Sequence, residues 1–229
     1  MSFKKKKYIV IKRAISKDLA LFVYNYFLIK RQVARTLFDS KYISPFEKMF
    51  GVWTDKQVPN TYSSYGDIVA ETLLLKTQPI MEKITKLKLN PSYSYTRAYK
   101  KGDILHRHKD RFSCEISTTM LLGGDPWEIY INPNHKAGGV YGPKFGVHDV
   151  QTYNPTTDKG VKVNLKPGDM LVYRGCELEH WREPFQGEKC VQVFLHYNNI
   201  KTPDAEKNIF DTRPHIGLPT DFKRKVSGV

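Results

Sequence analysis

The sequence contains, at residues 99–110, the stretch YKKGDILHRHKD. Side chains two residues apart on a β-strand point to the same face, so His108 and Asp110 can present an imidazole and a carboxylate to one ion if this segment is extended. Two ligands do not hold a metal ion by themselves, and a His-x-Asp pair also occurs by chance on surface strands. A third ligand is therefore needed from another segment of the chain.

A third candidate ligand ends the stretch GDMLVYRGCELEH at residues 168–180, which reads as a turn followed by a strand. Its last residue is His180. Two histidines and one carboxylate on one face of an octahedron leave three positions open, which suits non-haem iron(II), O2 and a bidentate organic acid. A structural zinc site is more often a closed tetrahedron. The predicted metal ligands and catalytic residues are therefore His108, Asp110 and His180.

The first of these stretches resembles the prolyl-4-hydroxylase-like branch of the 2-oxoglutarate- and iron(II)-dependent dioxygenases. The pattern of that family is Tyr-x-x-Gly, a second residue that is usually aromatic, and then His-x-Asp. Leu105 departs from the usual aromatic residue, and the resemblance extends over residues 93–198. The resemblance implies an enzyme, a hydroxylase that uses Fe(II), 2-oxoglutarate and O2 and releases succinate and CO2, with ascorbate as a further candidate cofactor. Four residues stand at the family's spacings, namely Tyr99, Gly102, His108 and Asp110.

The segment GEKCVQVFLH at residues 187–196 holds a candidate co-substrate ligand. On a strand, Lys189 shares a face with Val191 and Val193, and this apolar face is expected inside the barrel. An unpaired buried ammonium is very costly, so Lys189 would need an anionic partner, unless it reaches water at the end of the strand. In the family that the sequence resembles, a lysine nine or ten residues past the distal histidine pairs with the far carboxylate of 2-oxoglutarate. Lys189 stands nine residues past His180.

A tyrosine or threonine on a neighbouring strand commonly supports that carboxylate in the same family. The candidates here are Tyr95, Thr118 and Thr119, and the sequence does not decide among them. We include Thr119 and Tyr99 in the predicted co-substrate site together with Lys189. Tyr99 is equally consistent with core packing around a satisfied hydroxyl.

Helical segments come first in the chain and short strands follow, which indicates an α+β fold whose strands close into a double-stranded β-helix, or jelly roll. Residues 1–90 are expected to supply a strand and supporting helices, residues 91–200 the dioxygenase core, and residues 201–229 a partly ordered tail. Pro79 should kink or divide the second helix. The predicted elements are a strand at 8–11, helices at 17–38 and 67–87, and strands at 92–99, 115–122, 128–132, 161–166, 170–173 and 191–197.

Two longer segments contain many turn-forming residues. Residues 40–64 mix Pro, Gly, Asn and Ser with aromatic residues and are expected to form a loop that covers another part of the fold. Residues 123–159 are long and turn-rich and are expected to form a substrate-facing loop or hairpin, although their aromatic residues could equally form a satellite core. The aromatic residues of that second segment are Trp127, Tyr130, Tyr141, Phe145 and Tyr153.

The composition is that of a globular protein of 229 residues, with 40% hydrophobic residues and a mean hydropathy of −0.50. No apolar run approaches the roughly 20 residues that cross a bilayer, and the basic start lacks the apolar region of a signal peptide. We therefore expect a cytoplasmic protein with no membrane partner. The three cysteines, Cys114, Cys176 and Cys190, show no CxxC spacing and read as reduced packing residues.

The net charge of the chain and its resemblance to the prolyl-4-hydroxylase-like branch indicate different substrates. With 37 Lys and Arg against 23 Asp and Glu, the net charge of +14 favours polyanions, so a nucleobase or nucleic-acid substrate is one alternative. The basic residues are spread along the chain and do not gather around the metal motifs. A peptide or protein substrate of the prolyl type is therefore the preferred partner besides 2-oxoglutarate.

Two other classes of protein are alternatives to an oxygenase. His106 lies two residues before His108, so a His-x-His pair could form the metal site of a cupin that does not turn over 2-oxoglutarate. The metal site of a cupin also includes a glutamate shortly after the pair, and Glu115 stands too far along the chain to match this spacing well. A binding module that keeps the barrel without the chemistry is the other class. It would have little reason to retain four polar groups in a core.

Overall fold

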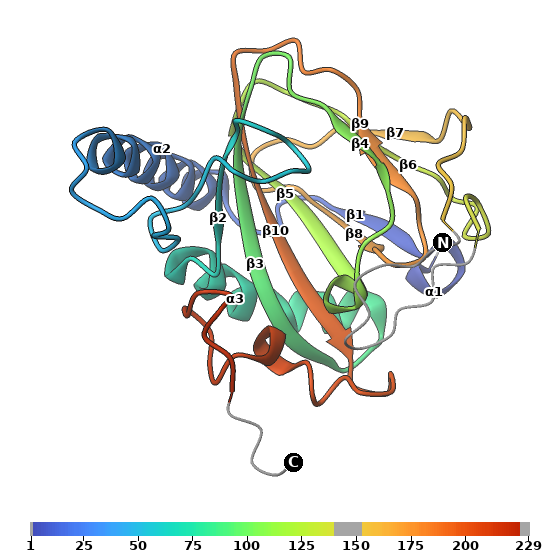
Figure 1. Cartoon of the computed structure of the whole chain (residues 1–229). Coiled ribbons are helices and arrows are strands. Elements are labelled where there is room, and N and C mark those ends of the chain that lie inside the picture. Colours follow the sequence, from blue (N-terminus) through green and yellow to red (C-terminus); the bar gives the residue numbers. More distant parts are fainter. Residues whose placement is uncertain (1, 140–152, 225–229) are drawn as a thin grey trace.

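The computed structural model describes residues 2–139 and 153–224. A helical N-terminal part precedes a part rich in strands, as Figure 1 shows. The elements in chain order are α1 (Phe3–Lys6), β1 (Tyr8–Ile11), α2 (Lys17–Asp39), β2 (Tyr62–Tyr65), α3 (Ile68–Thr85), β3 (Leu89–Lys100), β4 (Leu105–His108), the 3-10 helix η1 (Phe112–Cys114), β5 (Ile116–Gly124), β6 (Ile129–Ile131), β7 (Val161–Val163), β8 (Met170–Arg174), β9 (His180–Arg182), β10 (Lys189–Asn199) and the 3-10 helix η2 (Ile209–Thr212).

The strands form two antiparallel sheets that face each other. The larger sheet has six strands in the order β1-β8-β5-β10-β3-β2, and the smaller has four in the order β4-β9-β6-β7. Neighbours in these sheets are mostly distant in the sequence, and the chain crosses repeatedly from one sheet to the other (Figure 1). This arrangement confirms the predicted double-stranded β-helix.

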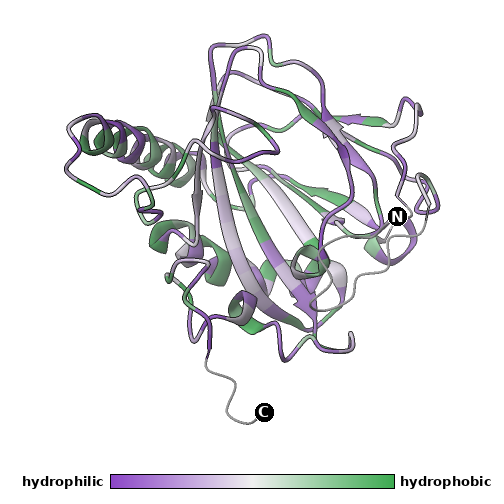
Figure 2. Cartoon of the chain, viewed as in Figure 1, coloured by the Kyte–Doolittle hydropathy of each residue, from purple (hydrophilic) through white to green (hydrophobic). Residues whose placement is uncertain are grey.

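Helices α2 and α3 cover the outer face of the larger sheet. Phe27 of α2 and Leu74 of α3 are fully buried in one apolar cluster with alternate residues of β10. The exposed side of α2 carries charged residues together with the apolar Phe22, Ile29 and Val33, so both kinds of residue are visible along that helix in Figure 2. The residues that β10 contributes to this cluster are Val191, Val193, Leu195 and Tyr197.

The other face of the larger sheet points into the space between the sheets, because successive side chains of a strand alternate. A second apolar cluster fills part of this space and includes Tyr99 of β3, Leu171 of β8 and Phe194 of β10. The smaller sheet adds Leu105 and Ile129 to the same cluster. Along the strands of the larger sheet, the residues that line the interior of the barrel therefore alternate with those that pack under the helices.

The two long helices begin where the sequence predicts. The Ser16 side chain accepts a hydrogen bond from the amide of Leu19, and the Asp67 carboxylate caps the first turn of α3. Pro79 lies inside α3 but does not divide it. Proline leaves the carbonyl four residues earlier without its helical donor. That residue is Leu75, which is 45% exposed, so water can reach this part of the helix.

Three short strands are absent from the predicted elements, namely β2, β4 and β9. Strand β2 lies at the end of the segment expected to be a loop, and its edge is extended by a bridge between Val52 and Ser63. Strand β9 has three residues, all of them buried. Segments of three or four residues are too short to show a period of two, so their pairing depends on neighbours that are distant in the sequence.

The C-terminal tail is tied to the core more firmly than expected. Arg213 is fully buried and forms an ion pair of 2.6 Å with Glu71 of α3, which is also fully buried. Asp211 accepts two hydrogen bonds of 2.8 Å from the guanidinium of Arg111. The described part of the tail therefore packs on both α3 and the open end of the barrel.

The described aromatic residues of the segment 123–159 are mainly packing residues. Trp127 contacts Tyr99 edge to face at 4.8 Å, and Tyr130 stacks on Trp181 at 5.4 Å. Two of the aromatic residues, Tyr141 and Phe145, lie outside the described residues. The three cysteines are free and buried, as predicted. Among the helices of the described ranges, none has the length and apolar character that a membrane span requires.

Candidate active site

The structure brings the three predicted metal ligands together between the two sheets. His108 ends β4 and is paired directly with His180, the first residue of β9. Asp110 follows β4, and its Oδ1 lies 3.6 Å from Nε2 of His108 and 3.5 Å from Nε2 of His180. One ligand atom from each residue lies within 4.8 Å of the others. Two imidazole nitrogens and a carboxylate oxygen thus converge from one side, as an iron(II) site requires.

Backbone carbonyls fix the orientation of both imidazoles. Nδ1 of His108 lies 2.7 Å from the carbonyl of His106, and Nδ1 of His180 lies 2.9 Å from that of Leu178. A carbonyl can only accept, so each Nδ1 carries the proton and each Nε2 keeps its lone pair. The nitrogens that face Asp110 are therefore the ones able to bind a metal ion.

Asp110 is held by groups other than the two histidines. The hydroxyl of Ser117 donates to Oδ2 at 2.7 Å, and the backbone amide of Asp110 donates to the carbonyl of Gly175 at 2.9 Å. Ser117 Oγ also lies 3.0 Å from Nδ1 of His196. These contacts leave Oδ1 free to serve as the metal ligand, and they explain why His196, a residue without a predicted role, is buried beside the site.

The site favours the deprotonated ligands that a cation needs. Burial opposes ionisation of Asp110, but interaction with His180 and His108 in their protonated forms holds the pKa of that carboxyl well below its usual range, and a bound cation would replace those protons. Burial lowers the pKa of His108 to about 4, and the nearby His180 contributes to this shift. An ionised carboxylate and neutral imidazoles are the forms that bind metal ions.

A second group of possible ligands shares Asp110 with the first and consists of Asp110, Cys114 and His196. Burial raises the pKa of the Cys114 thiol far above its usual range, with the charge of Asp110 adding to the effect. The thiolate is the form that binds metals, so a neutral buried thiol is a poor ligand. His108, Asp110 and His180 are therefore the better metal site.

Replacing Ser117 with alanine should weaken metal binding without removing the site. Loss of a group that orients a metal ligand typically costs about 10- to 100-fold in metal affinity, and Ser117 is the hydroxyl donor to Asp110. Titration of the purified variant with Ni²⁺ or with anaerobic Fe²⁺ measures this loss. An unchanged affinity would show that Asp110 does not need this donor.

His106 does not lie on the metal side, so the His-x-His pair of the cupin alternative does not form. The register of β4 against β9 shifts between Leu105 and His108, which indicates a β-bulge or similar irregularity. Such a shift breaks the alternation on which the prediction rested. Leu105 and His108 therefore both face the interior, whereas His106 is exposed.

The metal ligands line a cavity of about 390 Å³. Its walls include aromatic residues of β3, the apolar Leu105 and Ile129 of the smaller sheet, and Arg97 and Arg111. Tyr65 and Tyr93 stack at 4.9 Å on one side of it. The segment before β2 closes part of the opening, so the predicted loop at 40–64 does cover another part of the fold. Its members at the cavity are Val52, Thr54, Asp55 and Gln57.

Lys189 does not reach this cavity. Lys189 is exposed at the start of β10. It lies on the same face of the strand as Val191 and Val193, which pack under the helices. The prediction placed this apolar face inside the barrel and was wrong, because both faces of β10 are buried and the helices cover the more apolar one. The inner face of β10 carries Cys190, Gln192, Phe194 and His196.

The structure separates the other predicted co-substrate ligands. Thr118 points to the helix side, where its hydroxyl accepts from the amide of Leu195. Thr119 points inward, Tyr95 lines the cavity, and Tyr99 is buried with its hydroxyl lacking a hydrogen-bond partner among the described residues. Thr119 and Tyr99 thus lie in the barrel interior, but neither is among the residues that line the cavity, so their predicted role stays a prediction.

Arg182 is the charged interior residue that the sequence prediction missed. It ends β9, two residues after His180, and it is fully buried. Its guanidinium donates to Thr119 Oγ1 at 3.2 Å and to the carbonyl of Trp127. A signal was available, since a residue two positions past a metal ligand on a strand shares its inward face. Strand β9 has only three residues and was not predicted, so Arg182 was not placed on its inward face.

Several solved structures share the fold of this chain. A prolyl-4-hydroxylase from Pseudomonas putida aligns over 86% of this chain and 95% of its own, with a TM-score of 0.52 and 13% identity. HygX from Streptomyces hygroscopicus, with nickel and 2-oxoglutarate bound, aligns over 89% and 91%, with a TM-score of 0.52 and 14% identity. SnoN, an α-ketoglutarate-dependent epimerase from nogalamycin biosynthesis, aligns over 86% and 80%, with a TM-score of 0.58 and 12% identity. No protein-family model and no curated protein matches the sequence.

Proposed function

We propose that this chain, which has the fold of the 2-oxoglutarate- and iron(II)-dependent oxygenases, is an oxygenase of that kind and hydroxylates its substrate. The observation that carries the proposal is the convergence of His108, Asp110 and His180 on one point at the wall of a cavity. Similarity to structures at this level of identity supports the fold, whereas the ligand geometry supports the chemistry.

In this proposal the protein positions the reactants. His108 and His180 offer Nε2, Asp110 offers Oδ1, and the hydroxyl of Ser117 keeps the carboxylate in place. When bound, Fe(II) supplies the oxidising chemistry in which 2-oxoglutarate and O2 become succinate and CO2 and the substrate gains a hydroxyl group. The apolar walls, among them Leu105 and Phe194, limit the access of water to the reacting groups.

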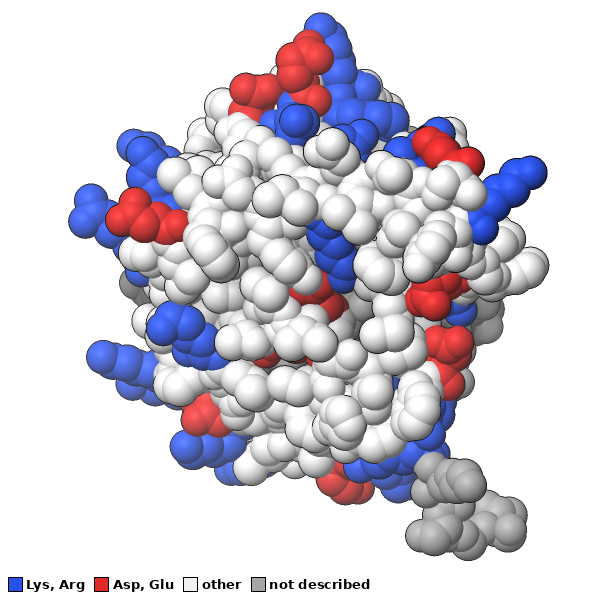
Figure 3. Space-filling view, turned by 90° about the vertical axis from the view of Figure 1, so that its left-hand side faces the viewer, with Lys and Arg blue, Asp and Glu red and all other residues white. Residues whose placement is uncertain are grey.

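A peptidyl substrate of the prolyl type fits the cavity better than a nucleotide. Tyrosine faces of the kind found at Tyr65 and Tyr93 can pack against an apolar ring. The two arginines that line the cavity are already paired, Arg97 with Asp55 and Arg111 with Asp211. On the face shown in Figure 3, Lys and Arg lie mostly toward the edge of a largely uncharged surface. Neither feature supplies the free cations that phosphates require.

The salt dependence of turnover separates these substrate classes. Succinate formation with proline-containing peptides should change little between about 50 and 200 mM salt, because such a contact is mainly apolar. Turnover that depends on several phosphate contacts should fall on the order of a hundredfold or more over this range, through counterion release. The measurement compares peptides with single-stranded oligonucleotides. Stimulation by oligonucleotides alone, lost at high salt, would make nucleic acid the substrate.

A further inference from the structure

The deep end of the barrel holds a positive charge without a negative partner. The Arg182 side chain is fully buried, and no carboxylate oxygen lies within hydrogen-bonding distance of its guanidinium in the described part of the chain. Glu128 forms its ion pair with Lys162 and not with Arg182. A buried charge is normally paired, because leaving it unpaired in a protein interior is costly.

Unused hydrogen-bond donors gather around this charge. Nε of Arg182, Nε of Arg97 and the hydroxyl of Tyr99 are buried atoms without hydrogen-bond partners among the residues described. Burial raises the pKa of Tyr99, while the charges of Arg97 and Arg182 and a direct polar contact with Arg97 oppose that rise, so both guanidinium groups lie near the hydroxyl. Buried donors are rarely left unsatisfied, so this cluster fits an acceptor that is anionic.

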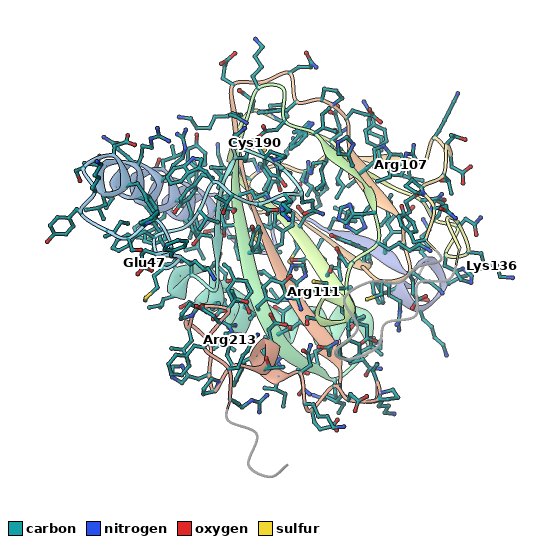
Figure 4. The ribbon with its side chains drawn as sticks, in the orientation of Figure 1. Glu47, Arg107, Arg111, Lys136, Cys190 and Arg213 are labelled. Carbon is teal, nitrogen blue, oxygen red and sulfur yellow. The ribbon has the colours of Figure 1, made fainter. Side chains whose placement is uncertain are left out.

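The sequence around β10 explains why an arginine from another strand is needed there. Cys190, near one end of the space between the sheets in Figure 4, occupies the inner face at the start of β10, while Lys189 beside it points outward. Cys190 lies near enough to Arg182 for each to affect the pKa of the other. The guanidinium of Arg182 thus brings to this region the charge that Lys189 does not supply.

The spacing from the metal site suits a short dicarboxylate. Arg182 is two residues from His180 on the same face of β9, a separation of about 6.6 Å along a strand. This is comparable with the length of a five-carbon chain. Leu105, which lines the cavity, is paired with Arg182 in the β4–β9 ladder, so the cavity wall adjoins the arginine.

We propose that Arg182, supported by Thr119 and Tyr99, binds the far carboxylate of 2-oxoglutarate, the role that the sequence analysis assigned to Lys189. The inference rests on the proposed function, since it presumes that 2-oxoglutarate is bound at the metal. Thr119 Oγ1 accepts from Arg182 at 3.2 Å and donates to Gln192 at 3.2 Å, so it holds the guanidinium in place. The Tyr99 hydroxyl comes from β3, on the other side of β10, and lies beside Arg97 with its own proton unused. Arg97 stays paired with Asp55 at the cavity wall.

A comparison of two ligands isolates this contact. Protein loaded with Ni²⁺ is titrated calorimetrically with 2-oxoglutarate and with 2-oxopentanoate, which has the same chain length but lacks the far carboxylate. The wild-type protein should prefer 2-oxoglutarate by about 30- to 4,000-fold, the effect of losing one partner of a buried charge pair. Arg182→Met should reduce this preference to under about threefold while leaving Ni²⁺ bound. Lys189→Met, the matched control, should leave the preference unchanged.

Other results of these titrations are also decisive. A preference retained in Arg182→Met, or abolished in Lys189→Met, would overturn the assignment. If Arg182→Met does not fold, as judged by its circular dichroism, Thr119→Val and Tyr99→Phe replace it. Each should reduce the preference by about tenfold, the effect of one hydrogen bond to a charged group, and no change in either would equally overturn the assignment. Failure of the wild-type protein to bind either 2-oxo acid would instead overturn the proposed function, and the assignment with it.

Discussion

Asp110→Ala should lose more than about 100-fold in affinity for iron(II) and should show no turnover. Even the loss of a group that only orients a ligand costs about 10- to 100-fold, and Asp110 is the single carboxylate of the three ligands. Removal of its charge also leaves His108 and His180 without their shared acidic neighbour. Equilibrium dialysis against anaerobic Fe²⁺, with thermal unfolding as a check of the fold, measures the effect.

His106→Ala is the matched control for this prediction. It removes a histidine two residues from His108, but its side chain is exposed and lies outside the cavity lining. Iron affinity and turnover should therefore stay at the wild-type level. The carbonyl of His106, which orients His108, is retained in the variant. Loss of iron in His106→Ala together with retention in Asp110→Ala would show that the ligands are wrongly assigned.

Arg213→Met should lower the free energy of unfolding by about 3–5 kcal/mol, since it leaves the carboxylate of Glu71 buried without its counter-ion. Both side chains are fully buried, and Arg213 also donates to the carbonyls of Phe210 and Leu218. Urea denaturation followed by circular dichroism measures the loss. The matched control is Arg35→Ala, which removes an exposed ion pair with Asp39 and should cost about 0.3–0.5 kcal/mol. Equal losses in the two variants would contradict a structural role for the buried pair.

The general fold was predictable from the sequence because it depends on local patterns. Ser16 and Asp67 mark the starts of the long helices, and the alternation in β3, β5 and β10 is long enough to identify strands. The metal ligands were predictable for a different reason. They are polar residues at the ends of short strands, where the spacing between His108 and Asp110 is a chemical signal that does not depend on the exact pairing.

The co-substrate residues were not predictable in the same way, because their positions depend on register and on packing. On β10 both faces are buried and the more apolar one meets the helices, whereas the prediction placed that face inside the barrel, so Lys189 was placed on the wrong side. At β4 the register shift between Leu105 and His108 cancelled the alternation that would have placed His106 beside the metal. The inward position of Arg182 depends on the pairing of β9 with β4, which the sequence did not predict.

The release of succinate from 2-oxoglutarate tests the proposed chemistry most directly. Wild-type protein is reconstituted with Fe²⁺ under anaerobic conditions, mixed with 2-oxoglutarate and a proline-containing peptide, and then exposed to O2. Succinate should form in amounts equal to the hydroxylated product and any uncoupled turnover together, and it should be absent without iron, without O2 and in Asp110→Ala. Succinate formation that is unchanged in Asp110→Ala, or a wild-type protein that binds iron and 2-oxoglutarate but forms no succinate with any substrate class, would contradict the proposed function.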